Sequence, residues 1–194
     1  MAIVFPESFT QFLVRHTPLS RAETEILKPF LDVVCLGADD YFLQAGSPVR
    51  KMAFLLSGVL RRFVFDEQGN KIVLQLIDEN HFVADSEGFY QRTVSASYVQ
   101  AVTSCRLLVI PLSEIDRLRL LYPKFQTAIY LIGQKQLLER IRHDEFLRIG
   151  TSSDQYHHFI THFPELARRV PLQDIASYLR ISPSSLSRIR RIKK

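Results

Sequence analysis

A change in the spacing of apolar residues limits the fold of this chain most strongly. Before Asp32 and after Ile110, apolar residues recur about every 3.6 positions, as in amphipathic helices. Between these two residues, the apolar positions form short runs separated by turn residues, at 33–36, 54–56, 60–65, 72–77, 97–102 and 107–110. Gly69-Asn70 separates two of the runs, which is typical of a β-hairpin. Short strands at this spacing predict an antiparallel sandwich or barrel.

Helical segments flank the predicted sheet on both sides. Residues 7–30 are expected to be helical, with Ser20 as an internal N-cap, and a short helix is expected from 113 to 122. A longer helix is predicted from 125 to 147, and Gly150 with the polar residues after it has the character of a hinge. The sequence therefore predicts an α+β chain in three units, residues 1–124, 125–149 and 150–194.

The excess positive charge lies in the last quarter of the chain. Residues 151–194 hold eight Lys or Arg against three acidic residues, whereas residues 1–150 hold seventeen of each sign, so the net charge of +5 belongs to the C-terminal part. Such an end can bind a polyanion with a strong dependence on salt. Charge alone fits equally well a solvated tail that keeps the protein in solution.

The local pattern at this basic end favours binding to nucleic acid. An amphipathic run at 172–179 is followed, after a tight turn, by a basic segment that opens on Ser182-Pro-Ser-Ser. Ser182 is a suitable N-cap and Pro183 a suitable first helical residue, because its missing N–H has no partner there in any case. Two short helices joined in this way predict a helix-turn-helix whose second helix enters the major groove of DNA.

Taken in order, these elements resemble the cyclic AMP receptor protein and FNR (Crp/Fnr) family of transcription regulators, over nearly the whole chain. The resemblance in the predicted sheet is carried by segments 41–47, 54–61, 67–74 and 101–110, and at the C-terminal end by 170–179 and 181–188. The end, with Phe163-Pro-Glu-Leu before it, is similar to divergent members of the Bacteroidetes type. The resemblance implies a cyclic-nucleotide-binding-type β jelly roll with flanking helices, a long dimerisation helix and a C-terminal helix-turn-helix.

The resemblance also implies residues that contact double-stranded DNA. Ser184 and Ser185 would face the groove with Arg188 one turn later, and arginine can form two hydrogen bonds to guanine. The full predicted set is Ser182, Ser184, Ser185, Arg188, Arg190, Arg191, Lys193 and Lys194, the last four on phosphates. In two places the chain departs from the family: its usual turn glycine is Arg180 and its frequent recognition-helix glutamate is Ser184. A β-wing after the recognition helix is not expected either.

The resemblance implies a homodimer through the helix at 125–147, with Leu131, Leu138 and Ile141 against the partner, and RNA polymerase as a further partner. Packing within one molecule is the alternative, and only the polar residues Gln134 and Lys135 between these apolar positions argue against it. A dimer would place its two recognition helices about 34 Å apart, on a palindromic site.

The predicted ligand pocket departs from that of cyclic-nucleotide-binding members. Those members hold the ribose with a glutamate, and the cyclic phosphate with an arginine and its neighbouring hydroxyl. Aligned without gaps, their positions are occupied here by Val83, Ala84, Asp85, Ser95 and Ala96. The phosphate-binding arginine is missing, which disfavours cyclic AMP as a cofactor. Arg92, Arg61 and Arg62 are the alternatives that stay open as substitutes, as does a roll without a ligand.

The remaining features predict no catalysis, no metal and no membrane segment. Cys35 and Cys105 lack the spacing of a metal site and are expected in the core. His157, His158 and His162 lack a fourth ligand, and Asp39-Asp40 is expected to lack a basic partner. The N-terminus lacks the pattern of a secretory signal, so a cytoplasmic protein is expected. The alternative function is a small-molecule sensor or protein-interaction module that binds DNA only non-specifically.

Overall fold

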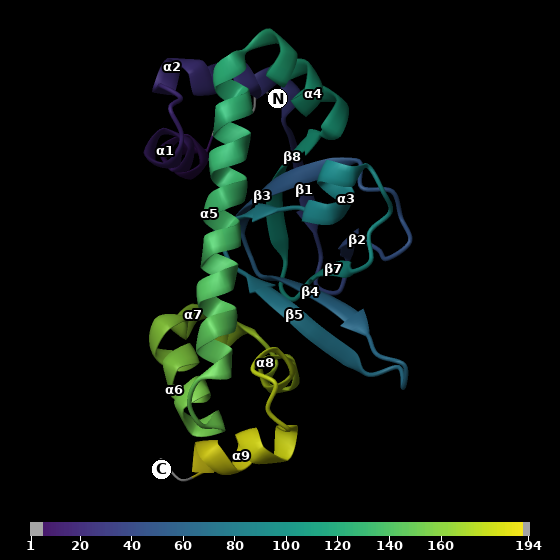
Figure 1. Ribbon diagram of the computed structural model, residues 1–194, viewed down its shortest axis with the longest axis vertical. Coiled ribbons are helices and arrows are strands. Elements are labelled where there is room, and N and C mark those ends of the chain that lie inside the picture. The colour runs from purple at the N-terminus through teal and green to yellow at the C-terminus, as the bar shows by residue number, and fades with distance from the viewer. Residues whose placement is uncertain (1–5, 192–194) are drawn as a thin grey trace.

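Two antiparallel four-stranded sheets form the body of the protein. The computed structural model describes residues 6–191, apart from the side chain of Arg148. One sheet has the order β1-β8-β3-β6 and the other β2-β7-β4-β5. The strands are β1 (Asp32–Leu36), β2 (Tyr41–Leu43), β3 (Lys51–Ser57), β4 (Leu60–Phe65), β5 (Lys71–Ile77), β6 (Phe82–Val83), β7 (Tyr98–Ala101) and β8 (Cys105–Pro111). The prediction of an α+β fold with an antiparallel β-roll is confirmed (Figure 1).

All six predicted strand regions are strands, and the hairpin at Gly69-Asn70 joins β4 to β5. In that turn the Asp66 carboxylate accepts hydrogen bonds from the backbone N–H groups of Gln68 and Asn70, and Gly69 has a φ of +80°, which glycine adopts without strain. Strands β2 and β6 and the short helix α3 (Ser86–Gln91) were not predicted, because none is long enough to display a period.

The helices before the sheet differ from the prediction of continuous helicity over 7–30. Helix α1 (Glu7–His16) ends before Pro18, α2 (Arg21–Thr24) begins directly after its N-cap Ser20, and a 3-10 helix, η1 (Glu25–Phe30), follows. Ser20 forms a capping box with Glu23, as expected of an N-cap. Pro29 removes a backbone donor, which favours the short 3-10 turn over a longer helix.

The main core lies between the two sheets and under the flanking helices. Ala53, Leu55 and Leu107 are completely buried, and Phe9 of α1 packs edge-on against Phe54 of β3, with 5.0 Å between ring centroids. Cys105 is buried as expected, but Cys35 is exposed on β1, so the core prediction was wrong for that residue. Successive side chains of a strand point to opposite faces, and Cys35 lies on the exposed face together with its register partner, the exposed Arg106 of β8.

Helix α5 connects the two ends of the molecule. It runs from Pro123 to Arg148, directly after α4 (Leu112–Leu121), and follows the long axis of the protein past the roll to the C-terminal helices (Figure 1). Phe125, Ala128 and Ile132 bury one face of α5 against the main core. No helix among residues 6–191 combines the length and apolar character needed to cross a bilayer.

Four helices form the C-terminal end, and one of them, α8, packs against β5. They are α6 (Ser152–His162), α7 (Pro164–Arg169), α8 (Leu172–Tyr178) and α9 (Pro183–Arg191). Their own small core contains Phe159, Ile175, Ala176, Leu179 and Leu186, and it continues into Phe63 and Val73 of the sheet. Ala176 of α8 is completely buried in this core. Helix α9 lies at the far end of the molecule from α1 (Figure 1).

Candidate nucleic-acid interface and ligand pocket

Helix α9 begins as the sequence predicts. Pro183 is its first residue, and the Ser182 hydroxyl accepts a hydrogen bond of 3.1 Å from the backbone N–H of Ser185, which is N-cap geometry. Leu186 is buried against α8, so α9 has one anchored face and one free face. The capped start and the single anchor fix which side of the helix meets solvent.

The free face of α9 carries the basic residues. Ser184, Arg188, Arg190 and Arg191 are exposed, and the Arg188 guanidinium donates a hydrogen bond of 3.2 Å to the Ser185 hydroxyl. Ser184, Arg188 and Arg191 share one side at helical spacing, whereas Arg190 lies toward the start of α8. Lys193 and Lys194, also predicted to contact DNA, lie outside the described residues.

A groove between α8 and α9 adds two polar residues that the sequence analysis missed. Gln173 and Ser187 line it together with Arg190 and Arg191. Only their exposure beside the predicted helices could have indicated them. An arginine at such a groove can reach a phosphate oxygen while its neighbours reach the base edges.

Arg180 forms the turn between α8 and α9, at the position where the resemblance implied a glycine. Its φ is +58°, in the left-handed region. The backbone N–H of Arg180 donates to the carbonyl oxygen of Ser177 and that of Ile181 to the carbonyl oxygen of Ala176, a Schellman motif closed by the buried Ile181 side chain. The loss of the glycine therefore leaves the turn geometry unchanged and adds the strain of a Cβ at positive φ.

A buried ion pair joins the C-terminal helices to the roll. One Arg61 nitrogen on β4 lies 2.5 Å from a carboxylate oxygen of Asp174 on α8, and both side chains are more than 90% buried. Arg61 also bonds Gln100 at 2.6 Å and Asp39 at 3.1 Å. The expectation that Asp39 has no basic partner was therefore wrong, because Arg61 comes from a distant part of the chain.

Two further contacts hold α7 and α8 in place. Arg169 forms two hydrogen bonds with the Glu79 carboxylate, at 2.6 and 2.8 Å, and lowers the pKa of Glu79 to about 2. The Ser177 hydroxyl accepts from the backbone N–H of Val73 on β5 and donates to the carbonyl oxygen of Lys71. The orientation of the helix-turn-helix relative to the roll is therefore fixed by side-chain contacts and not only by the chain connection.

In the roll, the predicted ligand residues divide into two groups. Asp85 is the N-cap of α3 and accepts hydrogen bonds from the backbone N–H of Gly88 at 2.9 Å and from the hydroxyls of Ser95 at 2.8 Å and Ser97 at 3.3 Å. Val83 is buried beside them in the core and Ala84 is half-buried. Ala96 is exposed, and its methyl side chain offers no hydrogen bond.

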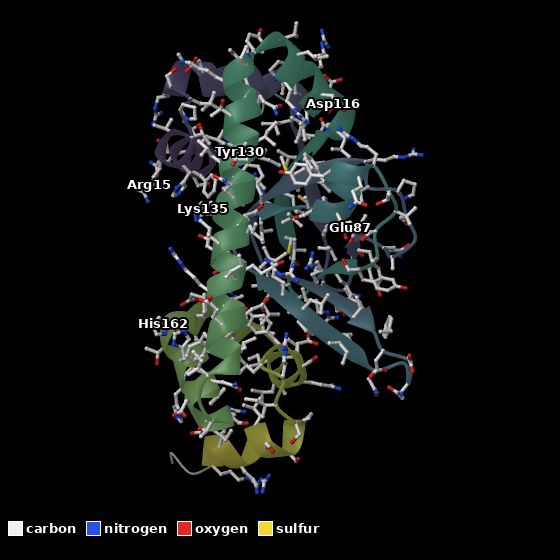
Figure 2. All side chains as sticks on the ribbon, viewed as in Figure 1. Arg15, Glu87, Asp116, Tyr130, Lys135 and His162 are labelled. Carbon is white, nitrogen blue, oxygen red and sulfur yellow. The ribbon has the colours of Figure 1, made fainter. Side chains whose placement is uncertain are left out.

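Arg92 lies apart from Asp85. It ends α3 in a left-handed conformation, with a φ of +59°, and pairs with both carboxylate oxygens of Asp116 on α4, at 2.6 and 2.8 Å. Figure 2 labels Asp116 on α4, above the roll. Asp85 and Ser95 therefore bond to each other, and two of the three arginines proposed as substitutes, Arg92 and Arg61, already have carboxylate partners.

The histidines of α6 pack with aromatic rings. His158 stacks on Phe146 and on His162, with ring centroids 3.6 and 3.8 Å apart, and His162 lies on the outer side of α6 (Figure 2). Within residues 6–191, no three His, Cys, Asp or Glu side chains are grouped so as to hold a metal ion.

Comparisons with known proteins match the roll and the whole fold. Residues 33–121 match the model of the cyclic nucleotide-binding domain. The structure of CLP, a c-di-GMP-responsive global regulator from Xanthomonas campestris, superposes with a TM-score of 0.71 at 19% identity, covering 89% of this chain and 91% of that one. A search of curated proteins found no relative.

Two further solved structures have a similar fold. FixK2 from Bradyrhizobium japonicum gives a TM-score of 0.70 at 13% identity, over 84% of this chain and 83% of that one. The catabolite activator protein of Thermus thermophilus gives 0.58 at 14%, over 93% and 85%. Residues 33–121 are thus similar to a cyclic nucleotide-binding domain, and the chain as a whole has the fold of these solved structures.

Proposed function

We propose that this protein is a DNA-binding transcription regulator of the Crp/Fnr type that acts as a homodimer on a palindromic site. The observation that carries the proposal is α9: a capped helix at the end of the molecule, anchored on one face, with the exposed Arg188 and Arg191 on the other side. This arrangement suits a recognition helix in the major groove. Such a regulator works beside RNA polymerase in the cytoplasm and binds rather than catalyses.

The apolar residues of α5 that do not contact the core support the dimer. Tyr130, Leu137, Leu138 and Ile141 are exposed by 58%, 58%, 53% and 43%, and Leu131 is half-buried. Leu137, Leu138 and Ile141 lie within one turn of each other on the same side of the helix. An exposed apolar stripe on a long helix fits pairing with the same stripe of a second copy. The three units 1–124, 125–149 and 150–194 are then our proposed sensor, dimerisation and DNA-binding parts.

Leu138→Glu tests the dimer. A charge at the centre of the stripe should convert the dimer to monomer in light scattering after gel filtration, because an unpaired carboxylate would be buried at the contact. Leu120→Glu is the matched control, since Leu120 is 86% exposed on α4, away from the stripe. Equal masses for the wild type and both variants would contradict dimerisation through α5.

Selection from random duplex DNA tests the DNA-reading role. The full-length protein should recover a palindromic consensus, and Arg188→Ala should lose the preference at one base pair per half-site, at a cost of about 1–3 kcal/mol. Arg106→Ala, an exposed arginine of β8, is the control and should recover the wild-type consensus. If no consensus is recovered, either without or with an added nucleotide, the protein binds only the phosphates of DNA, as in the alternative function.

Cyclic AMP is disfavoured as the effector in this proposal. The Asp85 carboxylate, at the position of the ribose-binding glutamate, has its bonds within the protein, and Ser95 replaces the phosphate-binding arginine. The selection should therefore give the same consensus with and without cyclic AMP. A consensus that requires cyclic AMP would overturn this part of the proposal.

A further inference from the structure

The imidazole of His143 links the long helix α5 to the helix-turn-helix. Its ring stacks on that of Tyr178, the last residue of α8, with 4.7 Å between ring centroids and 11° between ring planes. It also meets the ring of Phe163, between α6 and α7, edge-on at 6.4 Å. Tyr178 in turn packs edge-on against Phe159 of the C-terminal core. His143 therefore joins α5 to the core of the helices that lie around its lower end in Figure 1.

The Nε2 atom of His143 is buried and has no hydrogen-bond partner among the described residues. A neutral imidazole carries one N–H, whereas an imidazolium carries an N–H at both nitrogens. Protonation would therefore put a charged donor at a buried position without an acceptor, which costs more than an unbonded neutral nitrogen. Burial accordingly lowers the pKa of His143 below its ordinary value of 6.5.

Neighbouring charges act on His143 in both directions. Asp144, the next residue of α5, favours the charged ring, whereas His158 of α6 and Arg180 after α8 oppose it. The face of the Tyr178 ring also attracts a cation. Burial without an acceptor outweighs these attractions, in agreement with the direction in which the pKa of His143 is shifted.

The other titratable groups near His143 line the cleft of about 120 Å³ between β5, α5 and the C-terminal helices; besides Asp144 and Tyr178 they are Asp78, His81, Glu139 and Arg140. Asp78 already pairs with His81 at 2.8 Å. Glu139 pairs with Lys135, one turn earlier on α5. No carboxylate in the described part of the chain accepts a hydrogen bond from the buried nitrogen of His143, so none is in place to stabilise the charged ring.

We propose that His143 is a pH-sensitive contact: the neutral ring holds the end of α8 against α5, and uptake of a proton opens the stack and loosens that end. The pKa of His143 is lowered in the folded protein, so the folded state binds the proton more weakly than the unfolded chain. The contact is therefore complete above pH 6.5 and is lost as the pH falls through the folded-state pKa.

The expected opening is local. The Arg61–Asp174 pair still holds the start of α8 to the roll, whereas Tyr178 lies at its other end, next to the turn at Arg180. That turn sets the direction of α9, so its loosening would change how the proposed recognition helix is presented. Only this effect on DNA binding rests on the proposed function; the pH-sensitive contact rests on the surroundings of His143.

Hydrogen exchange of the full-length protein, followed by mass spectrometry between about pH 8 and about pH 5, tests the contact. Protection of the backbone amides at 175–181, relative to the intrinsic exchange rate at each pH, should be lost progressively below pH 6.5. Strands β3 and β8 should keep their protection, because they lie in the main core. An equal loss in these strands would mean unfolding of the whole molecule and would overturn a local contact.

Variants assign the response to one ring. His143→Phe keeps an aromatic ring for the stack and cannot take up a proton, so protection at 175–181 should no longer depend on pH. His16→Phe is the matched control, since His16 also packs against an aromatic ring but lies on α1, at the other end of the molecule. His81→Asn removes the second histidine of the cleft. Both of these variants should respond to pH as wild type does.

Three results would overturn the contact: constant wild-type protection at 175–181 below pH 6.5, a response that His143→Phe retains, or a response that His81→Asn abolishes. Melting temperatures at about pH 8 check that each variant is folded. If His143→Phe is not, NMR titration of the wild-type histidine rings replaces it. The signal of His143 should then titrate together with the loss of protection, and separate midpoints would overturn the assignment.

Selection of DNA sites by the same preparations at about pH 8 separates this proposal from the proposed function. A recovered consensus together with an α8 that ignores acid would overturn the pH-sensitive contact alone. An acid response of α8 without any consensus would overturn the DNA-reading role alone.

Discussion

The arginines of α9 and those of β4 show how differently one residue type works at the surface and in the interior. On α9, Arg188, Arg190 and Arg191 are exposed and their charge is available to a polyanion. On β4, Arg61 is buried with a carboxylate partner, whereas Arg62 has a buried Nε and no partner. The exposed arginines suit reversible binding of DNA, whereas the paired arginine holds two parts of the fold together.

The largest effect is expected from breaking the buried pair. Asp174→Ala leaves the Arg61 charge in the interior without its closest partner and should lower the free energy of unfolding by about 3–5 kcal/mol in urea titrations. The double variant Arg61→Met, Asp174→Leu should recover most of this loss, because apolar residues of similar size replace the pair. Equal stability of the single and double variants would show that the pair contributes no more than an exposed one.

A smaller effect, on binding alone, is expected at the surface. Arg191→Ala should weaken binding to every DNA sequence alike by up to about tenfold, and should reduce the slope of log affinity against log salt by about one. Titrations of specific and random duplexes at several salt concentrations measure both quantities. A loss confined to one sequence would assign Arg191 to base reading instead.

Arg180→Gly should stabilise the protein by about 1 kcal/mol, since glycine adopts a φ of +58° without the steric cost of a Cβ. Arg180→Ala is the matched control: it removes the charge and keeps the Cβ, so its stability should stay near that of wild type. If Ala and Gly stabilise equally, the charge of Arg180 and not its backbone conformation is the source of strain.

The smallest effect concerns pH. The pKa of Glu79 in the folded protein, about 2, is below its ordinary value of 4.5, so the folded state binds its proton more weakly than the unfolded chain. The contribution of the Glu79–Arg169 pair is therefore complete above pH 4.5 and is lost as the pH falls toward 2. The pair is partly exposed, so solvent screening should keep it below about 1 kcal/mol. Glu79→Gln should flatten that part of the stability curve, and an unchanged curve would contradict the pairing.

Local features were predictable because the residues that define them are adjacent in sequence. The cap at Ser182, the hairpin at Gly69 and the order of sheet, long helix and terminal helices all follow from short-range patterns. The DNA-contacting role of Arg188 and its neighbours remains a prediction, as does dimerisation.

Contacts between distant segments were not predictable. Arg61 and Asp174 are far apart in sequence, and no local pattern shows that β4 meets α8 or that Asp39 joins them. The same holds for Arg62: composition cannot reveal that it lacks the partner that Arg61 has. The exposure of Cys35 depends on which face of β1 and β8 the rest of the chain covers, and no local pattern shows this.

The contact of Ser177 with β5 has a consequence for handling the protein. Strand β5 is the edge of its sheet, and the backbone groups of Lys71 and Val73 that Ser177 satisfies would otherwise be free to pair with a strand of another molecule. Any change that lifts α8 from the roll therefore uncovers an aggregation-prone edge. Variants that loosen this contact should precipitate sooner on warming than their unfolding midpoints alone would indicate.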